Sequence, residues 1–287
     1  YFSTEEDEPI PKLILKREKG IIYSVNSWNN NFYMHTNKNA EDFKIDITDS
    51  LEKQDWKPFI LPKKEVLIGG LTFLKNWIIR SETSNALDKL FVRNISTNIE
   101  QELIFSDETI YVPGVSLVQR DRDTDEIYLG YSSPKTPSRV YKYNLSNKSK
   151  ILVKEQEIPS GHDPENYIVE RVEFKSHDGR LVPLTITRHK KTKTDGSANL
   201  LLYGYGSYGN SMSPSFSSTR LSLIDRDVIW ATAHIRGGME KGMKWWKEGK
   251  LTNKKNTFED YIYAGKYLIE NNYTSKGKII GMGGSAG

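Results

Sequence analysis

Residues 278–287 read KIIGMGGSAG, a short apolar run that passes into the pattern G-x-S-x-G. This pattern is the sequence of a nucleophile elbow, a strained turn that exposes a catalytic serine at the end of a strand. The run 278–282 supplies the strand, and the glycine and alanine neighbours of Ser285 are small enough for a closely packed turn. The stretch therefore predicts that Ser285 is a nucleophile, with an ordinary glycine-rich loop as the alternative.

The sequence before the elbow alternates between buried strands and helices. Residues 200–209, LLLYGYGSYG, and 228–238, VIWATAHIRGG, are apolar runs that end in glycine-rich loops. Residues 256–272 have the spacing of a helix, with Thr257 as the expected N-cap. Its expected apolar stripe is Tyr261, Ala264, Tyr267 and Leu268. Apolar strands that alternate with helices indicate a mostly parallel, covered sheet, so residues 156–287 are predicted to form an α/β domain.

The first 155 residues contain short runs rich in β-branched and aromatic residues, separated by polar turns. The same order of three runs recurs in residues 20–49, 65–97 and 111–147. The spacing, about 45–50 residues, is typical of four-stranded propeller blades. Equivalent places are held by Tyr33, Ile78 and Tyr128, and by Phe43, Leu90 and Tyr141. We therefore expect a partial β-propeller of about three blades in residues 1–155; a β-sandwich with strands of similar length is the alternative.

Composition narrows the classes of function. The 287 residues carry a formal net charge of only +4, and acidic and basic residues are interspersed, which favours a mixed solvated surface over a nucleic-acid partner. No apolar run is long enough to span a membrane, and the opening YFSTEEDEPIPK lacks the regions of a signal peptide, so no membrane partner is expected. The absence of cysteine removes thiolate metal sites and fits a reducing compartment, so we expect a cytoplasmic location and no metal.

Four stretches together identify a family. They are YGYGSYG at 203–209, HIRGG at 234–238, WKEGKLTNKKNTFEDYI at 246–262 and GGSAG at 283–287. In this order they resemble the prolyl oligopeptidase family of serine peptidases, and most of all its oligopeptidase B branch, also called protease II. The likeness continues at lower density through SSPKTPSRVYKYNL and NFYMHTN, so it covers nearly the whole chain.

The resemblance implies a partial β-propeller followed by the first part of an α/β-hydrolase domain, without a cofactor. It implies cleavage of short peptides, after Lys or Arg in the oligopeptidase B branch, through an acyl-enzyme on Ser285. The oxyanion donors implied by motif position are the backbone N–H of Ala286 and the hydroxyl of Tyr205. For Tyr205, a buried tyrosine that bonds a loop carbonyl is the alternative.

Other residues near these motifs have two interpretations each. Arg236 could bind a substrate carboxylate or carbonyl, or it could pin its loop through Glu240 or an aspartate, which is the interpretation we prefer. Trp245 and Trp246 either line the cleft between the domains or pack as an amphipathic turn. After YGYGSYG the oligopeptidase B branch often carries two aspartates that favour paired basic sites. The corresponding NSMSPSF has serines there instead, which weakens that expectation.

In α/β hydrolases the triad runs Ser, then Asp or Glu, then His along the chain. All histidines here precede Ser285: His35, His162, His177, His189 and His234. The sequence therefore resembles a fragment that ends at the elbow, and we expect it to be inactive as a peptidase by itself. Three alternatives stay open: a non-catalytic remnant or peptide-binding propeller protein, half of a split enzyme whose other chain supplies Asp and His, and an esterase or lipase.

Overall fold

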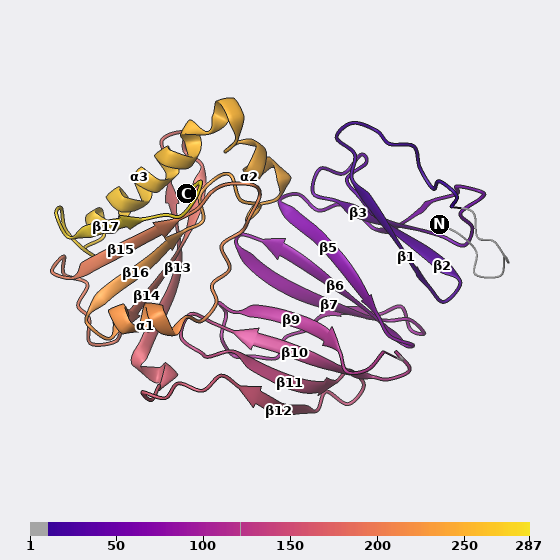
Figure 1. The fold of residues 1–287 in the computed structure, drawn as a ribbon, viewed down its shortest axis with the longest axis horizontal. Helices are drawn as coiled ribbons and strands as arrows, with labels where there is room; N and C mark the ends of the chain where they lie inside the picture. Colours follow the sequence, from indigo (N-terminus) through magenta and orange to yellow (C-terminus); the bar gives the residue numbers. More distant parts are fainter. Residues whose placement is uncertain (1–10, 121) are drawn as a thin grey trace. The chain divides into compact units, whose positions relative to one another are not determined.

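The computed structural model describes residues 11–120 and 122–287, which divide into two compact units. One unit ends at Lys63 and the other begins at Lys64. Each unit is built mainly from strands, and the second also contains the helices (Figure 1). None of the helices in the described ranges is long and apolar enough to cross a membrane.

The first unit is one four-stranded antiparallel sheet in the order β1-β2-β3-β4. Its strands are β1 (Tyr23–Trp28), β2 (Asn31–Thr36), β3 (Lys44–Thr48) and β4 (Lys57–Ile60). Tyr33 in β2 is buried, as expected of a blade core. Phe43 is not in a strand, because it has φ 69 in the turn before β3 and stacks on His35. Its predicted equivalence with Leu90 and Tyr141, which lie within strands, is therefore wrong.

The second unit opens with two more four-stranded antiparallel sheets, β5-β6-β7-β8 and β9-β10-β11-β12. The strands of the first are β5 (Val66–Phe73), β6 (Trp77–Ser84), β7 (Leu87–Asn94) and β8 (Glu100–Glu102). Those of the second are β9 (Val112–Leu117), β10 (Glu126–Ser132), β11 (Arg139–Asn144) and β12 (Lys150–Glu155). A shared apolar core that includes Ile79, Leu90, Ile127 and Leu129 packs these two sheets together. The described residues thus contain three propeller-type sheets, which confirms the expected partial propeller.

The remainder of the second unit is a five-stranded sheet in the order β13-β14-β16-β15-β17. The strands are β13 (Tyr167–Lys175), β14 (Leu181–His189), β15 (Asn199–Gly204), β16 (Val228–Ala233) and β17 (Ile279–Met282). β13 and β14 form an antiparallel hairpin, and β14 is antiparallel to β16. β15 is parallel to both β16 and β17. The carboxyl ends of β15, β16 and β17 therefore lie at the same edge of the sheet.

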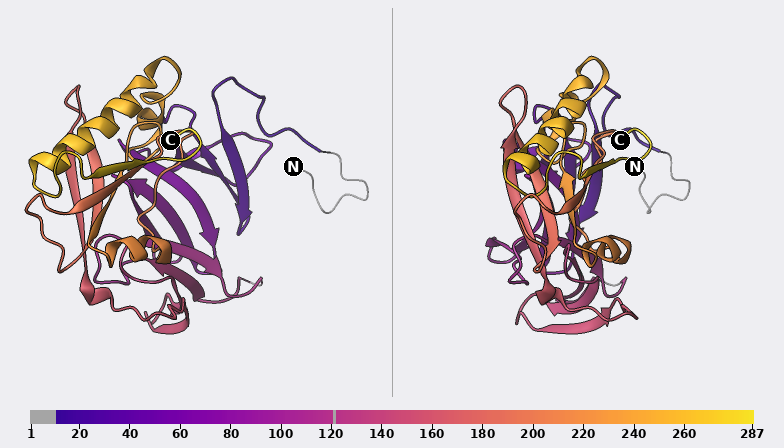
Figure 2. Two further views of the ribbon diagram at one scale, coloured as in Figure 1. Left: turned by 60° about the vertical axis from the view of Figure 1, so that its left-hand side comes forward. Right: turned by 90° about the vertical axis from the view of Figure 1, so that its left-hand side faces the viewer.

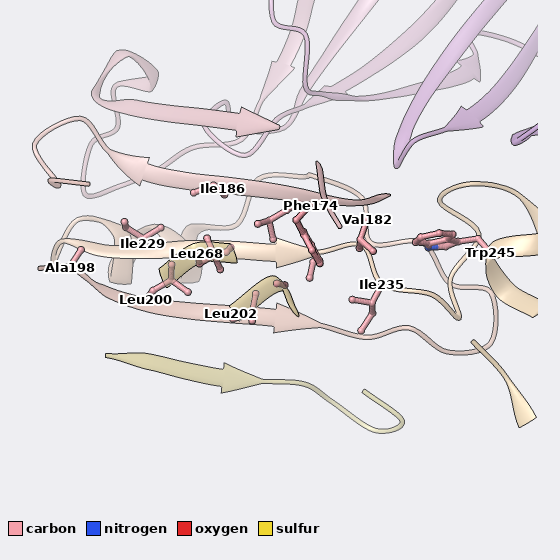
Figure 3. Packing of buried hydrophobic residues seen from close by; sticks show 14 residues of the cluster. Phe174, Val182, Ile186, Ala198, Leu200, Leu202, Ile229, Ile235, Trp245 and Leu268 are labelled. Carbon is pink, nitrogen blue, oxygen red and sulfur yellow. The ribbon is translucent and has the colours of Figure 1, made fainter. Parts of the chain in front are cut away.

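Helices cover both faces of this sheet. Successive side chains of a strand point to opposite faces, so an apolar strand has side chains to bury on each face. On one face, α3 (Lys255–Glu270) buries Ala264 and Leu268 against Leu202 and its neighbours, and the core extends along the strands to Ile235 (Figure 3). α1 (Ser218–Ile224) lies on the other face (Figure 2). Its buried residues Leu221 and Ile224 belong to a cluster against which Trp230 packs. The short elements are η1 (Pro164–Asn166), α2 (Met243–Lys247) and η2 (Leu251–Asn253).

The start of α3 differs from the prediction. The helix begins at Lys255 with Lys254 in the N-cap position, so Thr257 lies within the first turn and is not the cap. The Thr257 hydroxyl, which is buried, donates to the carbonyls of Arg236 and Gly249 at 2.7 and 3.1 Å. The Thr257 hydroxyl therefore bonds carbonyls that are distant in the sequence instead of capping the start of α3.

Candidate active site

Three loops meet where the parallel strands end. The Tyr205 loop (residues 205–209) follows β15, the Arg236 loop (residues 234–238) follows β16, and the elbow (residues 283–287) follows β17. Ligands of open α/β sheets bind outside the carboxyl ends of the strands, at the point where successive connections leave in opposite directions. Here β16 and β17 lie on opposite sides of β15, so the loops occupy such a point.

The elbow has the strained backbone that a nucleophile turn requires. Ser285 has φ 54, a region that residues other than glycine rarely adopt. The Gly287 N–H donates to the Gly284 carbonyl at 2.8 Å and closes the turn, and the Ser285 side chain is exposed. A Cβ on Gly287 would lie 2.9 Å from the Gly204 carbonyl oxygen and 3.0 Å from the Tyr205 Cα, so the turn packs directly on the end of β15.

A pocket of about 350 Å³ opens beside the elbow. Its wall is mostly apolar, and it is lined by Tyr205, Ile235, Phe258, Tyr261, Met282 and Ala286 with the glycines of the neighbouring loops. A larger pocket of about 440 Å³ lies in the second propeller sheet of this unit and contains none of the predicted site residues. The elbow pocket is the better candidate because it adjoins the elbow, in which Ser285 is exposed in a strained turn.

Of the predicted oxyanion donors, the structure brings Tyr205 and Ala286 to the same pocket. Tyr205 is half-buried at the end of β15, and Ala286 directly follows Ser285. The Ser207 hydroxyl donates to the Ala286 carbonyl at 3.2 Å, which joins the Tyr205 loop to the elbow. Ser207 was not singled out from the sequence, although the repeated glycines around it indicate a loop with close backbone contacts.

Arg236 lies beneath these loops and is 1% exposed. Its Nε and Nη2 donate to the two carboxylate oxygens of Asp260 at 2.8 and 2.6 Å, and its backbone N–H donates to Asp260 at 3.0 Å. Its Nη1 donates to Asp178 at 2.5 Å. The side chain is thus held by two aspartates rather than by Glu240. Burial alone would lower the pKa of Arg236, but its hydrogen bonds to the carboxylates of Asp260 and Asp178 outweigh burial and raise the pKa.

Sequence reasoning expected Glu240 or an aspartate as the partner of Arg236 but did not identify Asp260 and Asp178. Asp260 is fully buried and also accepts a hydrogen bond from the Ser176 hydroxyl at 2.5 Å. A signal was available, since Asp260 is four residues before Ala264 on the apolar stripe of α3. A carboxylate on an apolar stripe needs a buried cation or several donors. Asp178 lies in the turn between β13 and β14, and nothing in the sequence connects it to Arg236.

The histidines have partners away from the elbow. His234, which is fully buried, bonds the Thr185 hydroxyl at 2.7 Å, and burial together with the nearby Arg171 holds the pKa of His234 well below its usual range. The other contacts are His35 with Phe43, His162 with the Lys135 carbonyl, His177 with Ser176, and His189 with the Lys191 N–H. None of these contacts is with a residue of the elbow.

The two tryptophans of α2 have different surroundings. Trp245 is buried in the core of the sheet, and its indole N–H donates to the His234 carbonyl at 3.1 Å (Figure 3). Trp246 is partly buried, with the Lys250 ammonium 3.4 Å from its ring centre. Neither lines the elbow pocket, and the arrangement is that of a packed amphipathic turn.

Known proteins are similar to this chain in sequence and in architecture. A family model for the N-terminal β-propeller domain of prolyl oligopeptidase matches residues 1–156, and the model of the prolyl oligopeptidase family matches residues 214–287. Dipeptidyl aminopeptidase BI of Pseudoxanthomonas mexicana is 37% identical over 96% of this chain and 38% of its own length. Protease 2 of Moraxella lacunata is 32% identical over 99% of this chain and 41% of its own length.

A solved structure of oligopeptidase B from Trypanosoma brucei, with covalently bound antipain in a closed form, superposes with a TM-score of 0.89. It is 28% identical, and the match covers 99% of this chain and 41% of that one. The chain thus spans about two fifths of the length of these relatives. The family matches confirm the resemblance seen in the sequence: the chain belongs to the prolyl oligopeptidase family, whose members are serine peptidases.

Proposed function

We propose that Ser285 is the nucleophile of a peptidase site that cleaves short peptides through an acyl-enzyme. The observation that carries the proposal is the φ of 54 at Ser285, in a tight turn at the carboxyl end of β17 and beside a pocket. Strain of this kind in a residue other than glycine is retained where the turn has a function. Tyr208 in the neighbouring glycine-rich loop has a similar φ of 57, so the proposal rests on the combination of this conformation with the G-x-S-x-G pattern, the strand end and the pocket.

In the proposed reaction, Ser285 Oγ attacks the carbonyl carbon of the scissile peptide bond and gives its proton to a general base. The oxygen of the tetrahedral intermediate accepts hydrogen bonds from the Ala286 N–H and the Tyr205 hydroxyl. The amine then leaves with the proton, and water releases the acyl group by the same steps. Arg236 contributes indirectly, since its bonds to Asp260 and Asp178 fix the loop that follows β16.

For the substrate, we propose peptides cut after Lys or Arg. The similarity to Protease 2 and to oligopeptidase B supports this preference. Ser213 and Ser215 stand where that branch often has aspartates, so we expect one basic residue to suffice and a second one to add little. The cytoplasmic location expected from the sequence stays a prediction.

We further propose that residues 1–287 alone do not hydrolyse peptides at a measurable rate. The contacts of the described histidines are with residues outside the elbow, and none of these contacts directs an imidazole to Ser285. Without the base, a site of this type retains only the part of its rate that binding and the oxyanion donors supply, about 10³–10⁴ over water.

The test is hydrolysis of a fluorogenic peptide with a single Arg by the purified chain and by Ser285→Ala. We expect no difference between the two. Rapid hydrolysis that Ser285→Ala abolishes would overturn the predicted inactivity and support Ser285 as nucleophile. If the two proteins bind the peptide equally strongly and still do not hydrolyse it when a second chain that carries the Asp and His is added, that result would favour a peptide-binding propeller protein.

A second candidate, half of a split enzyme, is favoured by the outer edge of β17. Ile280 is 61% exposed and Met282 is 48% exposed, and the outer side of β17 pairs with no other described strand. An apolar strand edge is suited to pairing with a further strand. If a second chain supplies that strand together with Asp and His, peptidase activity should appear on mixing and depend on Ser285.

A further inference from the structure

Lys254 is the lysine that immediately precedes α3, and it contacts the Tyr205 loop. Its Nζ donates to the Gly206 carbonyl at 2.7 Å and to the Ser207 hydroxyl oxygen at 2.6 Å. Ser207 in turn donates to the Ala286 carbonyl at 3.2 Å. Three segments that are far apart in the sequence are thus joined by consecutive hydrogen bonds.

The direction of these bonds follows from the donors available. A lysine ammonium only donates, so the Ser207 oxygen must accept from Lys254. A serine hydroxyl carries one proton, and with its lone pair engaged by Lys254 that proton is free to point at the Ala286 carbonyl. Ser207 is 8% exposed, so water has little access to compete for these bonds.

We propose that Lys254 is a positioning residue that holds the Tyr205 loop and the elbow in one fixed arrangement through Ser207. The inference rests on the proposed function, because it concerns the two oxyanion donors of that site. The Gly206 and Ser207 contacts fix the loop that carries Tyr205. The Ala286 contact fixes the residue whose N–H is the other donor. Preorganised donors stabilise the oxyanion only when both are correctly placed.

Stability of α3 does not explain the position of Lys254. A cation near a helix N-terminus is opposed by the helix dipole, and the Lys254 side chain makes no capping bond to α3. Partial burial lowers the pKa of the Lys254 ammonium, a further cost of keeping the charge there. The Lys254 ammonium also lies 5.7 Å from the ring centre of Phe258 in α3, but its shorter contacts are the bonds to Gly206 and Ser207, which account for a lysine at this place.

The chain offers a matched control in the next residue. Lys255 has an 83% exposed side chain, and its ion-pair partner is Glu259 at 3.8 Å on the surface of α3. Lys254→Met and Lys255→Met each remove one lysine ammonium, at adjacent positions in the chain. Only the first removes the link to the elbow. Ser207→Ala removes the link while leaving both lysines, and Lys254→Arg keeps a cation of different shape.

The probe is a small alkyl fluorophosphonate, used on the complete 287-residue chain. Ser285 Oγ forms a bond to phosphorus, fluoride leaves, and the serine proton passes to solvent. The labelling rate is followed by intact mass, with Ser285→Ala as the blank and circular dichroism as the check of folding. Because the phosphonyl oxygen occupies the oxyanion position, the rate reports on the donors without requiring a peptide or a specificity pocket.

We expect labelling to slow roughly 10- to 100-fold in Lys254→Met and in Ser207→Ala, as for misplacement of a reacting group by about 1 Å. Lys255→Met should label at the original rate, and Lys254→Arg should recover part of the loss. The double variant Lys254→Met/Ser207→Ala should be no slower than the slower single variant, since both changes break one path.

Equal and measurable labelling rates in the unaltered chain, Lys254→Met and Ser207→Ala would overturn the positioning role and leave Ser285 as the nucleophile. If the unaltered chain is not labelled, hydrogen exchange of the amides in residues 283–287 decides the positioning role by itself. Labelling of Ser285→Ala as fast as the unaltered chain would overturn both. If Lys254→Met does not fold, Ser207→Ala decides the matter, together with hydrogen exchange of the amides in residues 283–287. Faster exchange there in Ser207→Ala supports the link, and unchanged exchange with unchanged labelling contradicts it.

Discussion

Two buried arginine–carboxylate clusters lie in the hydrolase part of the chain, and they differ in how completely their hydrogen bonds are satisfied. Arg236 directs Nε, Nη1 and Nη2 to Asp260 and Asp178. Arg171, in β13, donates through Nη2 to the Ala86 carbonyl at 3.2 Å, while its buried Nε and Nη1 have no partner among the described residues. The same type of side chain is fully paired in one cluster and largely unpaired in the other.

The carboxylates show the same contrast. Both oxygens of Asp260 accept hydrogen bonds. Glu240, in the second cluster, accepts from the Met212 N–H through Oε1 at 3.0 Å, and its buried Oε2 has no partner in the described part of the chain. Burial raises the pKa of Glu240 to about 7 and lowers that of Arg171 to about 10.

The difference in hydrogen bonding between the two clusters corresponds to their different positions in the fold. The Arg236 cluster lies under the loops of the candidate site, where a single arrangement is needed. The Arg171 cluster lies where the turn between β6 and β7 meets the hydrolase sheet, and the Ala86 N–H donates to the Glu240 carbonyl there at 2.9 Å. A fully paired cluster fixes structure, whereas an underpaired one makes stability depend on protonation.

The largest expected effect is the loss of Asp260. Asp260→Ala leaves Arg236 buried without its main partner, and breaking a buried pair in this way costs about 3–5 kcal/mol. The free energy of unfolding, measured with urea, should fall by that amount. Glu259→Ala on the same helix is the control. Its exposed pair with Lys255 should be worth less than about 0.5 kcal/mol, and equal losses in both variants would contradict the assignment.

Glu240→Gln should change the pH dependence of stability. Glu240 has a raised folded pKa, so its contribution is fully present below the unfolded value of 4.5 and is lost as pH rises through about 7. Arg171 favours the ionised form and Asp88 opposes it. The amide introduced by Glu240→Gln cannot ionise, so the variant should exceed the original chain by less than about 1 kcal/mol at pH 5 and by up to about 3 kcal/mol at pH 8.

The check is urea unfolding of both proteins between pH 5 and pH 8. A constant difference across this range would show that Glu240 does not titrate in the folded chain. His234 faces the same arginine, and the pKa of its imidazole is held well below the usual value of 6.5. The unfolded chain therefore binds a proton there that the folded chain does not, and stability rises with pH up to about 6.5. Both proteins contain His234, so this contribution cancels in the difference between them.

Features that depend on interactions between residues close together in the sequence could be predicted, and features that depend on distant residues could not. Alternating and continuous apolar runs are local, so the strands of the propeller sheets and of the α/β sheet were predictable. The elbow was predictable because a tight turn restricts which residues can neighbour Ser285. Phe43 and Thr257 were assigned wrongly because a turn in one case and distant carbonyls in the other outweighed local preference.

The partners of Arg236 show where sequence reasoning ends. An aspartate was a correct expectation, but Asp260 and Asp178 lie 24 and 58 residues away along the chain. Glu240 is much nearer in sequence and faces Arg171 instead. Which carboxylate meets which arginine depends on how α3 and the β13–β14 turn pack on the sheet. That packing is set by side-chain volume and not by spacing.

Arg171→Met tests the same cluster by removing its arginine instead of its carboxylate. The expected change in the free energy of unfolding is smaller. Near pH 5 Glu240 is protonated, so removing a cation with two unpaired nitrogens should leave stability almost unchanged. At pH 8 the variant leaves an ionised Glu240 without a nearby cation and should lose about 1–2 kcal/mol. Urea unfolding at the two pH values measures this, and an equal loss at both would mean that Arg171 acts through packing alone.

The smallest expected effect is at the rim of the paired cluster. Asp178 is about one third exposed, and although partial burial alone would raise its pKa, the bonds from Arg236 lower it. Its stabilising contribution is therefore present at neutral pH and is lost as pH falls through the lowered value. Asp178→Asn should cost about 1 kcal/mol or less at pH 7, because Asp260 still holds Arg236 and water reaches the rim. Thermal unfolding at pH 7 measures this. A loss as large as that of Asp260→Ala would mean that the two aspartates hold Arg236 only together, and the cluster would then be a single unit rather than a buried pair with a rim.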